Sequence, residues 1–335
     1  MHEEPDDLSA DSLSAALELH WDIKARSIEY APVGFGSYHW VATQSSAQKW
    51  FITADRVGAE AQDSGENADP FANLLAAYSS VSALRSRGLS FAVAPVADKS
   101  KQVVRRIESE WAVAVFELID GKPSGIGPWS EAAACAGAAR LVGQLHASEP
   151  PDTLRPFSFA ISHRAELFGD LSRPWLSGPY GERARRLLIS SDKGVRALLA
   201  HYDGLVDEVR QDGSPWVTTH GEPHSANLIE SADGSLHLVD WDTVRLAPPE
   251  RDLASLLIEQ PEVLSAYRSG GGSRAPRPGA LQLFRVWWDV SEICGYICHF
   301  RGPHGDSRDD QTAWKALERY LDVNSNWPNL SDSAI

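Results

Sequence analysis

The residues best suited to chemistry lie between positions 219 and 242. A predicted strand at 216–220 leads into a tight loop, and a second predicted strand at 236–241 follows. Together they carry four side chains with oxygen donors: Glu222, Asn227, Asp240 and Asp242. Carboxylate and amide oxygens suit Mg²⁺, which needs few protein carboxylates when phosphates complete its shell. A separate carboxylate can accept a proton from a hydroxyl nucleophile, so the segment predicts phosphoryl transfer.

Three motifs in this region resemble those of a known family. Residues 220–227, HGEPHSAN, resemble the H-G-D-x-H-x-x-N catalytic loop of the aminoglycoside phosphotransferase and choline kinase family. Residues 238–242, LVDWD, are similar to its I-D-W-D metal-binding segment, and residues 247–253, APPERDL, resemble a run in spectinomycin phosphotransferases. The resemblance implies an α+β, bilobal, protein-kinase-like fold and an enzyme that uses ATP or GTP to phosphorylate a small-molecule hydroxyl.

The resemblance also implies roles for single residues. Glu222 takes the place of the catalytic aspartate, although its side chain is one methylene longer. Asn227 and Asp240 take the places of the Mg²⁺ ligands. Asp242 is left open between a second metal ligand, a substrate contact and a brace for the loop.

Four neighbouring residues are expected to have structural roles. His220 and His224 resemble histidines that brace the family's catalytic loop. Arg251 and Asp252 are predicted to form an ion pair at the start of a helix, where an aspartate also suits the helix dipole.

A glycine-containing turn is the second candidate site. Residues 33–39, VGFGSYH, lie between two predicted strands. Gly34 and Gly36 permit close approach of the backbone, and successive N–H groups can contact phosphate oxygens. Ser37 and Tyr38 are predicted to contact the nucleotide as part of this lid. The alternative is an ordinary β-turn, but the position in the first hairpin of a kinase-like lobe favours nucleotide binding.

Residues 116–121, FELIDG, are predicted to connect the two lobes. In that position the backbone groups of Glu117 and Ile119 would hydrogen-bond the edge of a purine. The alternative is a simple buried strand end.

The third predicted strand departs from the family pattern. The family places a lysine there to bind the α- and β-phosphates, but this strand has Thr53 at that position. Lys49 lies roughly 13 Å away at about 3.3 Å per residue, and Arg56 points to the other face. The expected partner glutamate is also unclear, because Glu60 and Glu66 fall in a loop. The phosphate clamp is therefore rearranged, supplied by another residue, or absent.

The elements that position these residues divide into two lobes. The N-lobe, 1–120, is predicted to be a nucleotide-binding sheet with helices at 12–20 and 71–88 and strands at 28–43, 49–53, 91–98, 103–108 and 111–121. The C-lobe, 121–335, is predicted to contain the catalytic loop, the metal site and a helical acceptor-binding region, with helices at 130–148, 163–170, 179–190, 193–211, 249–258, 281–300 and 309–323.

Composition limits the partners. The 335-residue chain has a net charge of −15, so it has no general attraction for nucleic acid or anionic membranes. A cationic or neutral acceptor is favoured over an anionic one. Three cysteines cannot build a disulfide framework. The acidic start shows no signal-peptide pattern, and no apolar run approaches the roughly 20 residues of a membrane span, so a cytoplasmic location is expected.

Three functions remain open at this stage. The first is an antibiotic phosphotransferase that confers resistance, acting on an aminoglycoside, an aminocyclitol or a similar compound. The second is a metabolite kinase for a sugar, an amino alcohol or a nucleoside. The third is a pseudokinase-like binding protein without turnover, which Thr53 and Glu222 favour and which the retained Asn227 and Asp240 argue against.

Overall fold

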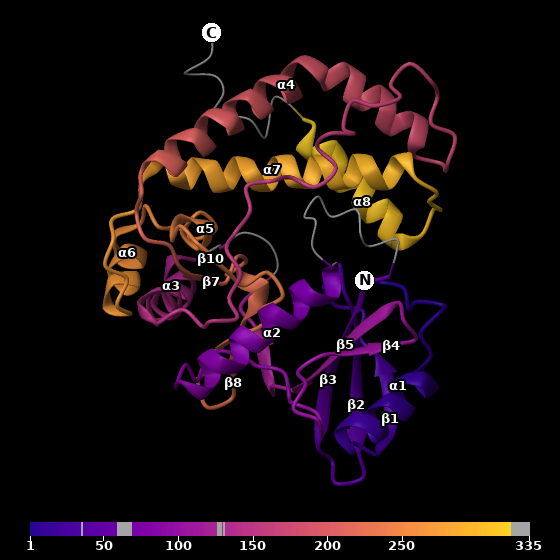
Figure 1. Ribbon diagram of the computed structural model, residues 1–335, viewed down its shortest axis with the longest axis vertical. Coiled ribbons are helices and arrows are strands. Elements are labelled where there is room, and N and C mark those ends of the chain that lie inside the picture. Colours follow the sequence, from indigo (N-terminus) through magenta and orange to yellow (C-terminus); the bar gives the residue numbers. More distant parts are fainter. Residues whose placement is uncertain (35, 59–68, 126–128, 130, 323–335) are drawn as a thin grey trace.

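The computed structural model describes residues 1–34, 36–58, 69–125, 129 and 131–322. Figure 1 shows a sheet from the first part of the chain at one end of the molecule and long helices at the other. The N-terminal sheet has five antiparallel strands in the order β1-β2-β3-β5-β4. Their bounds are Ala25–Tyr30 (β1), Tyr38–Gln44 (β2), Lys49–Arg56 (β3), Arg105–Ile107 (β4) and Trp111–Glu117 (β5).

Alternation along β3 sends its side chains to two different environments. Ile52 packs against α1 (Ala10–Ala16), together with the π-helical turn that follows. Thr53 and Asp55 lie on the opposite face, because they pair with two alanines of β5 that pack against α2 (Pro70–Ser86). Along β3, alternate residues such as Thr53 and Asp55 therefore point toward α2, and the residues between them point toward α1.

Two small antiparallel sheets frame the segment between residues 217 and 247. One has the order β6-β8-β9 and the other pairs β7 with β10. The strands are β6 (Gly121–Pro123), β7 (Val217–Thr219), β8 (Leu228–Ser231), β9 (Leu236–Leu238) and β10 (Arg245–Ala247), with a short 3-10 turn at Ser225–Asn227. Residues 118–120 connect the last strand of the five-stranded sheet to β6.

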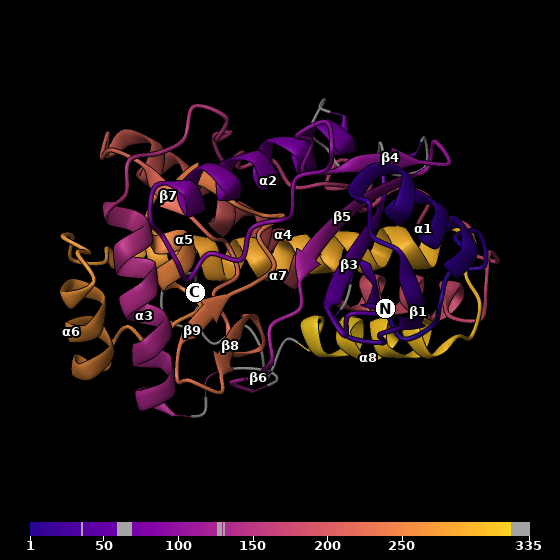
Figure 2. The same cartoon turned by 90° about the horizontal axis from the view of Figure 1, so that it is seen from below.

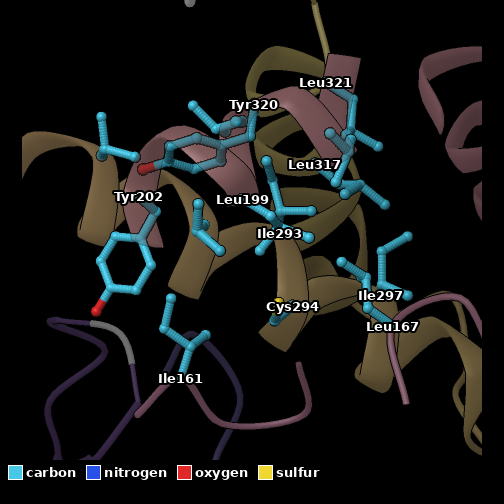
Figure 3. Close-up of a cluster of buried hydrophobic side chains, with 14 of the residues drawn as sticks. Ile161, Leu167, Leu199, Tyr202, Ile293, Cys294, Ile297, Leu317, Tyr320 and Leu321 are labelled. Carbon is cyan, nitrogen blue, oxygen red and sulfur yellow. The ribbon is translucent and has the colours of Figure 1, made fainter. Parts of the chain in front are cut away.

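The helices of the second part of the chain form the largest core. They are α3 (Ala132–Ala147), α4 (Gly181–Gln211), α5 (Glu250–Leu253), α6 (Pro261–Ser269), α7 (Pro278–Arg301) and α8 (Arg308–Tyr320). Helices α4 and α7 lie side by side (Figures 1 and 2), and α8 packs on α7. Figure 3 shows Leu199, Ile293 and Leu317 from these three helices meeting in that core. None of the described helices is both long and apolar enough to cross a membrane.

Two of the elements predicted from sequence are wrong, and two predicted helices are joined into one. Residues 91–98 form no strand, because the segment meets the β9 backbone only around a single bridge between Ala92 and Leu238. Residues 163–170 form successive turns rather than a helix. The helices predicted at 179–190 and 193–211 are one helix, α4, in which Ser190 and Ser191 bond carbonyl groups and do not interrupt the turns.

Other differences concern short elements. The helix predicted at 249–258 is helical only over α5 and continues as turns. The strands β6 and β10 and the helix α6 were not predicted. Three or four residues carry too little periodicity to identify a strand, and these strands form because their partners lie beside them in the fold.

Two glycines let α3 and α6 approach closely; the helices lie side by side in both views (Figures 1 and 2). A Cβ atom at Gly143 of α3 would lie 2.1 Å from the carbonyl oxygen of Tyr267. A Cβ atom at Gly270, directly after α6, would lie 2.1 Å from the carbonyl oxygen of Arg140. Backbone occupies both positions, so a larger residue would force the helices apart.

We predict that Gly143→Ala lowers the free energy of unfolding by about 1–3 kcal/mol, the usual cost of overpacking, although alanine is the better helix former. The matched control is Gly204→Ala in α4, where no described atom lies within 4 Å of the added Cβ. That variant should gain up to about 1 kcal/mol from helix propensity. Urea denaturation measures both, and a gain in stability for both variants would contradict the close helix contact.

Candidate active site

The carboxylate of Asp252 anchors the start of the candidate catalytic loop, residues 220–227. It is completely buried and accepts hydrogen bonds from His220 N at 2.9 Å, Gly221 N at 2.6 Å and His146 Nε2 at 3.0 Å. Burial by itself would raise the pKa of Asp252, but the hydrogen bond from His146 and the neighbouring positive charges hold it below its usual value. The loop therefore starts from a fixed, charge-assisted anchor.

His220 links the loop to the segment after β9 that carries Asp240. Its Nδ1 accepts from Glu222 N at 3.2 Å, and its Nε2 donates to Val239 O at 2.9 Å. These partners require the neutral ring with the proton on Nε2. Burial lowers the pKa of His220 to about 4, which favours the same form. The histidine thus braces the loop, as the sequence predicts.

Asn227 connects the loop that carries Glu222 with the segment before Asp240. Its Nδ2 donates to Glu222 O at 3.0 Å, and its backbone carbonyl accepts from Val239 N at 3.0 Å. With the amide nitrogen used in this way, the side-chain oxygen Oδ1 is the end left for a ligand. The hydrogen bonds bring Asn227 and Glu222 together and tie both to the residue before Asp240.

The Glu222 carboxylate is about a quarter exposed, and its Oε2 lies 3.7 Å from His224 Nε2. Burial opposes ionisation here, but the interaction with His224 and the charge of Arg251 outweigh it and lower the pKa of Glu222. The carboxylate is therefore ionised at neutral pH and able to accept a proton.

Asp240 and Asp242 form a crowded acidic pair. Asp240 has a backbone φ of +65°, an uncommon conformation for a residue with a side chain and a form of strain that collects at functional sites. Desolvation by the surrounding protein, and then the charge of Asp242, raise the pKa of Asp240 well above its ordinary value. Burial, followed by the charge of Glu222, raises the pKa of Asp242 to about 6, although Arg245 opposes this. A cation placed between these groups would relieve their repulsion.

The donor set fits a Mg²⁺ ion that phosphates help to hold. In the described part of the chain, no three His, Cys, Asp or Glu side chains are arranged to bind a metal alone. An amide oxygen from Asn227 and a carboxylate from Asp240 would be the protein ligands, and Mg²⁺ commonly binds through one or two carboxylates plus substrate phosphates.

The glycine turn places its predicted contacts on different sides of the sheet. Gly34 and Gly36 have φ values of +71° and +97°, conformations that glycine adopts without strain. Ser37 Oγ hydrogen-bonds Asp55 Oδ1 on the face covered by α2. Tyr38 instead packs edge-on against Trp111 on the α1 face, so its side chain is not brought together with the other nucleotide candidates.

The connector between the lobes follows β5 directly. Glu117 is the last residue of β5 and pairs with Trp50, and Leu118 N donates to Lys49 O at 3.3 Å. Ile119 lies beyond the strand, and no backbone hydrogen bond within the described residues engages its peptide groups. Its backbone is thus available to a ligand.

The position expected for lysine carries no cation. Thr53 is 7% exposed, and Arg56 points to the other face, where it bonds Asp7 and stacks on Trp111. Asp55 is the next residue on the face of Thr53. The helix α2 contains no acidic residue, so it supplies no partner glutamate. Phe35, Glu60 and Glu66 lie outside the described residues.

The predicted ion pair between Arg251 and Asp252 does not form, because the two side chains take different partners. Arg251 donates to Thr219 Oγ1 at 3.0 Å and to Thr243 O at 2.9 Å. Sequence reasoning also missed His146, whose contact with Asp252 joins residues 106 positions apart and leaves no local signal. Asp55 could have been found, because extending the predicted strand 49–53 by two residues puts it on the same face as Thr53.

Comparisons with known proteins identify the family of the chain. Residues 69–284 match the model of the phosphotransferase enzyme family. The chain is 30% identical over 255 residues to protein StrN of Streptomyces griseus, which covers 71% of this chain and 74% of that protein.

Solved structures show the same fold. Spectinomycin phosphotransferase APH(9)-Ia, in complex with ADP and spectinomycin, superposes with a TM-score of 0.72 at 16% identity, covering 96% of this chain and 97% of that one. Choline kinase LicA from Streptococcus pneumoniae gives a TM-score of 0.53 at 14% identity, with coverage of 93% and 98%. The predicted bilobal fold is confirmed, and the chain belongs to the phosphotransferase enzyme family as a small-molecule phosphotransferase with a protein-kinase-like fold.

Proposed function

We propose that this enzyme transfers the γ-phosphoryl group of ATP or GTP to a hydroxyl of an antibiotic, and that it confers resistance in this way. The observation that carries the proposal is the hydrogen-bonded arrangement that joins Glu222 and Asn227 to Val239, the residue before Asp240, through His220. Related structures support it: APH(9)-Ia contains ADP and spectinomycin, and the amicoumacin kinase hAmiN contains AMP-PNP, Ca²⁺ and its antibiotic, with a TM-score of 0.60 at 12% identity over 96% of each chain.

The residues divide the work as follows. Glu222, ionised at neutral pH, accepts the proton of the acceptor hydroxyl as that oxygen attacks phosphorus. Asn227 and Asp240 would hold Mg²⁺, which supplies positive charge to the phosphate oxygens when bound. The glycine turn presents backbone N–H groups to the phosphates, and the Glu117–Ile119 connector presents polar backbone groups to the purine. Positioning of this kind provides most of the catalysis in phosphoryl transfer.

A cavity of about 670 Å³ is the candidate acceptor site. It lies between segment 1–7, the glycine turn, α7 and the start of α8, and carboxylates in its lining outnumber basic groups. Glu292 of α7 lines it and is close enough to Glu222 to feel its charge, which supports the choice of this cavity as the acceptor site. Burial raises the pKa of Glu292, and a cationic acceptor would offset that cost.

The main experiment is a phosphotransfer assay with ATP or GTP and Mg²⁺ against spectinomycin, amicoumacin, a macrolide and choline. Product with an antibiotic supports the proposal, and product with choline alone favours a metabolite kinase. Nucleotide binding without any turnover favours a pseudokinase, a reading that the missing cation at Thr53 supports.

We predict that Asp240→Asn abolishes Mg²⁺-dependent phosphotransfer while the protein remains folded. The substitution removes the carboxylate charge from the proposed ion site but conserves the shape of the side chain. Circular dichroism should show a native spectrum, and Mg²⁺ titration should show no recovery of activity. Turnover close to that of the unsubstituted enzyme would contradict the metal assignment.

For the proposed base, Glu222→Ala should lower kcat by about 10²- to 10⁴-fold, the usual contribution of general-base catalysis. Nucleotide affinity should change little, because Glu222 faces the acceptor rather than the purine. Glu222→Asp restores the family's residue and should keep partial activity or exceed the starting enzyme. Equal losses in both variants would show that the carboxylate does not act as a base.

For the acceptor cavity, Glu292→Gln should raise KM for a cationic acceptor about tenfold, equivalent to about 1.4 kcal/mol, and weaken its dependence on salt. The affinity for nucleotide should stay the same. Glu262→Gln on α6, an exposed carboxylate far from the cavity lining, is the matched control. An unchanged KM in Glu292→Gln would show that this cavity does not bind the cationic group.

A further inference from the structure

The α2 face of β3 carries a carboxylate where the family leads one to expect a positive charge. Asp55 Oδ1 accepts a hydrogen bond from Ser37 Oγ in the glycine turn. Its other oxygen, Oδ2, is shielded from solvent and has no hydrogen-bond partner in the described part of the chain. A buried, unpartnered carboxylate oxygen is costly unless something supplies its missing interaction.

Asp55 lies between the two elements proposed to hold the nucleotide phosphates. The glycine turn contacts it directly through Ser37, and Asp242 of the metal loop acts on it electrostatically. Tyr78 of α2, which is 2% exposed, is in electrostatic range of Asp55, Asp240 and Asp242 together. This places the Oδ2 atom next to the path of the phosphates.

No described positive group neutralises this carboxylate. On β2, His39 shares the same face, but burial lowers its pKa to about 4, so it is neutral at pH 7. On β4, Arg106 lies two strands away and is bound by the carbonyl oxygens of Val57 and Ser109. The amino group of Met1 donates to Ser37 O and does not bond Asp55, and the other titratable neighbours, Tyr78, Asp240 and Asp242, are acidic.

We propose that Asp55 replaces the lysine of the phosphate clamp by acting as a neutral carboxylic acid that donates a hydrogen bond from Oδ2 to a phosphate oxygen. The geometry assigns the two oxygens different roles: Oδ1 accepts from Ser37, as a carbonyl oxygen does, and Oδ2 is left to carry the proton. Nucleotide binding would then take up one proton from solvent for each ionised Asp55. The inference rests on the proposed function, because it assumes that nucleotide phosphates enter this cleft.

The state of the carboxyl group in the protein supports this assignment. Burial, together with the charge of Asp242, raises the pKa of Asp55 to about 7, although the hydrogen bond from Ser37 opposes the shift. Phosphate charge would raise it further. Three carboxylates in this region could suggest a second metal instead, but no three acidic side chains in the described residues are arranged to hold one.

The sign of the pH dependence separates the two explanations. A protonated clamp binds nucleotide more weakly as pH rises through the carboxyl pKa, by up to about tenfold per pH unit. A metal ligand must be ionised, so it would bind Mg²⁺–nucleotide more tightly as pH rises. The nucleotide also titrates over this range, but its contribution cancels in the ratio of the affinities of two proteins measured at the same pH.

The experiment is isothermal titration calorimetry of ADP binding from pH 5.5 to 8.5, with EDTA and with Mg²⁺, for the starting enzyme, Asp55→Asn and Asp55→Ala. Asn keeps an acceptor for Ser37 and a permanent N–H donor, so its affinity should exceed that of the starting enzyme increasingly above pH 7. Asp55→Ala should bind more weakly than Asn at every pH. In buffers of different ionisation enthalpy, the starting enzyme should take up more protons on binding than Asp55→Asn or Asp55→Ala.

Thermal unfolding without nucleotide gives a second test. Because the pKa of Asp55 in the folded state is above its ordinary value of 3.8, ionisation costs stability as pH rises from about 4 through 7. The stability of Asp55→Asn relative to the starting enzyme should therefore increase over that range. A constant difference, or an affinity ratio between the two proteins that does not change with pH, would overturn the inference. If neither the starting enzyme nor either variant binds nucleotide at any pH, the proposed function fails as well.

Discussion

The carboxylate of Asp252 collects hydrogen bonds from three donors that the chain alone would not hold together: two successive backbone N–H groups of the catalytic loop and the ring of His146 on α3. Because the group is fully buried, loss of any donor would leave charge without compensation. The loop cannot shift without breaking these bonds. The position of Glu222 therefore depends on packing between α3 and the segment at α5.

Hydrogen bonds that start at this anchor connect the proposed base with the proposed metal ligands. His220 hydrogen-bonds both Glu222 N and Val239 O. Asn227 hydrogen-bonds the backbone of the same two residues, Glu222 and Val239. The proposed base and the proposed metal ligands thus belong to one hydrogen-bonded unit. A substitution that disturbs the brace should affect both, whereas Asp240→Asn and Glu222→Asp each act on one end of it.

Negative charge dominates the interior of the cleft. The charge of Glu222 makes ionisation of Asp240 and Asp242 more costly, and Asp55 on β3 adds to this cost for Asp240 rather than opposing it. A triphosphate could enter such a site only with compensation from a divalent cation, a proton or backbone donors. The same charge makes the neighbouring cavity, whose lining includes Glu292, suited to cationic molecules.

The first residues of the described chain tie the two lobes together near this cavity. Met1 N donates to the carbonyl oxygens of Gly34 and Ser37 in the glycine turn, and His2 N donates to Asp309 at the start of α8. Sequence reasoning used the acidic character of this segment only to exclude a signal peptide. Its contact with Asp309 joins residues 307 positions apart in sequence, so only the folded chain shows that the segment forms one wall of the cavity.

The sequence by itself determined the family, the bilobal fold and the identity of the candidate residues, because HGEPHSAN and LVDWD are local patterns in which residue type and spacing already carry the chemistry. It also located the departure at Thr53, since alternation along a strand is a local property. Tertiary structure decided the partners of Asp252 and Arg251, the face occupied by Tyr38 and the shielding of Asp55. These depend on which distant segments pack together and exclude water, and no local spacing contains that information.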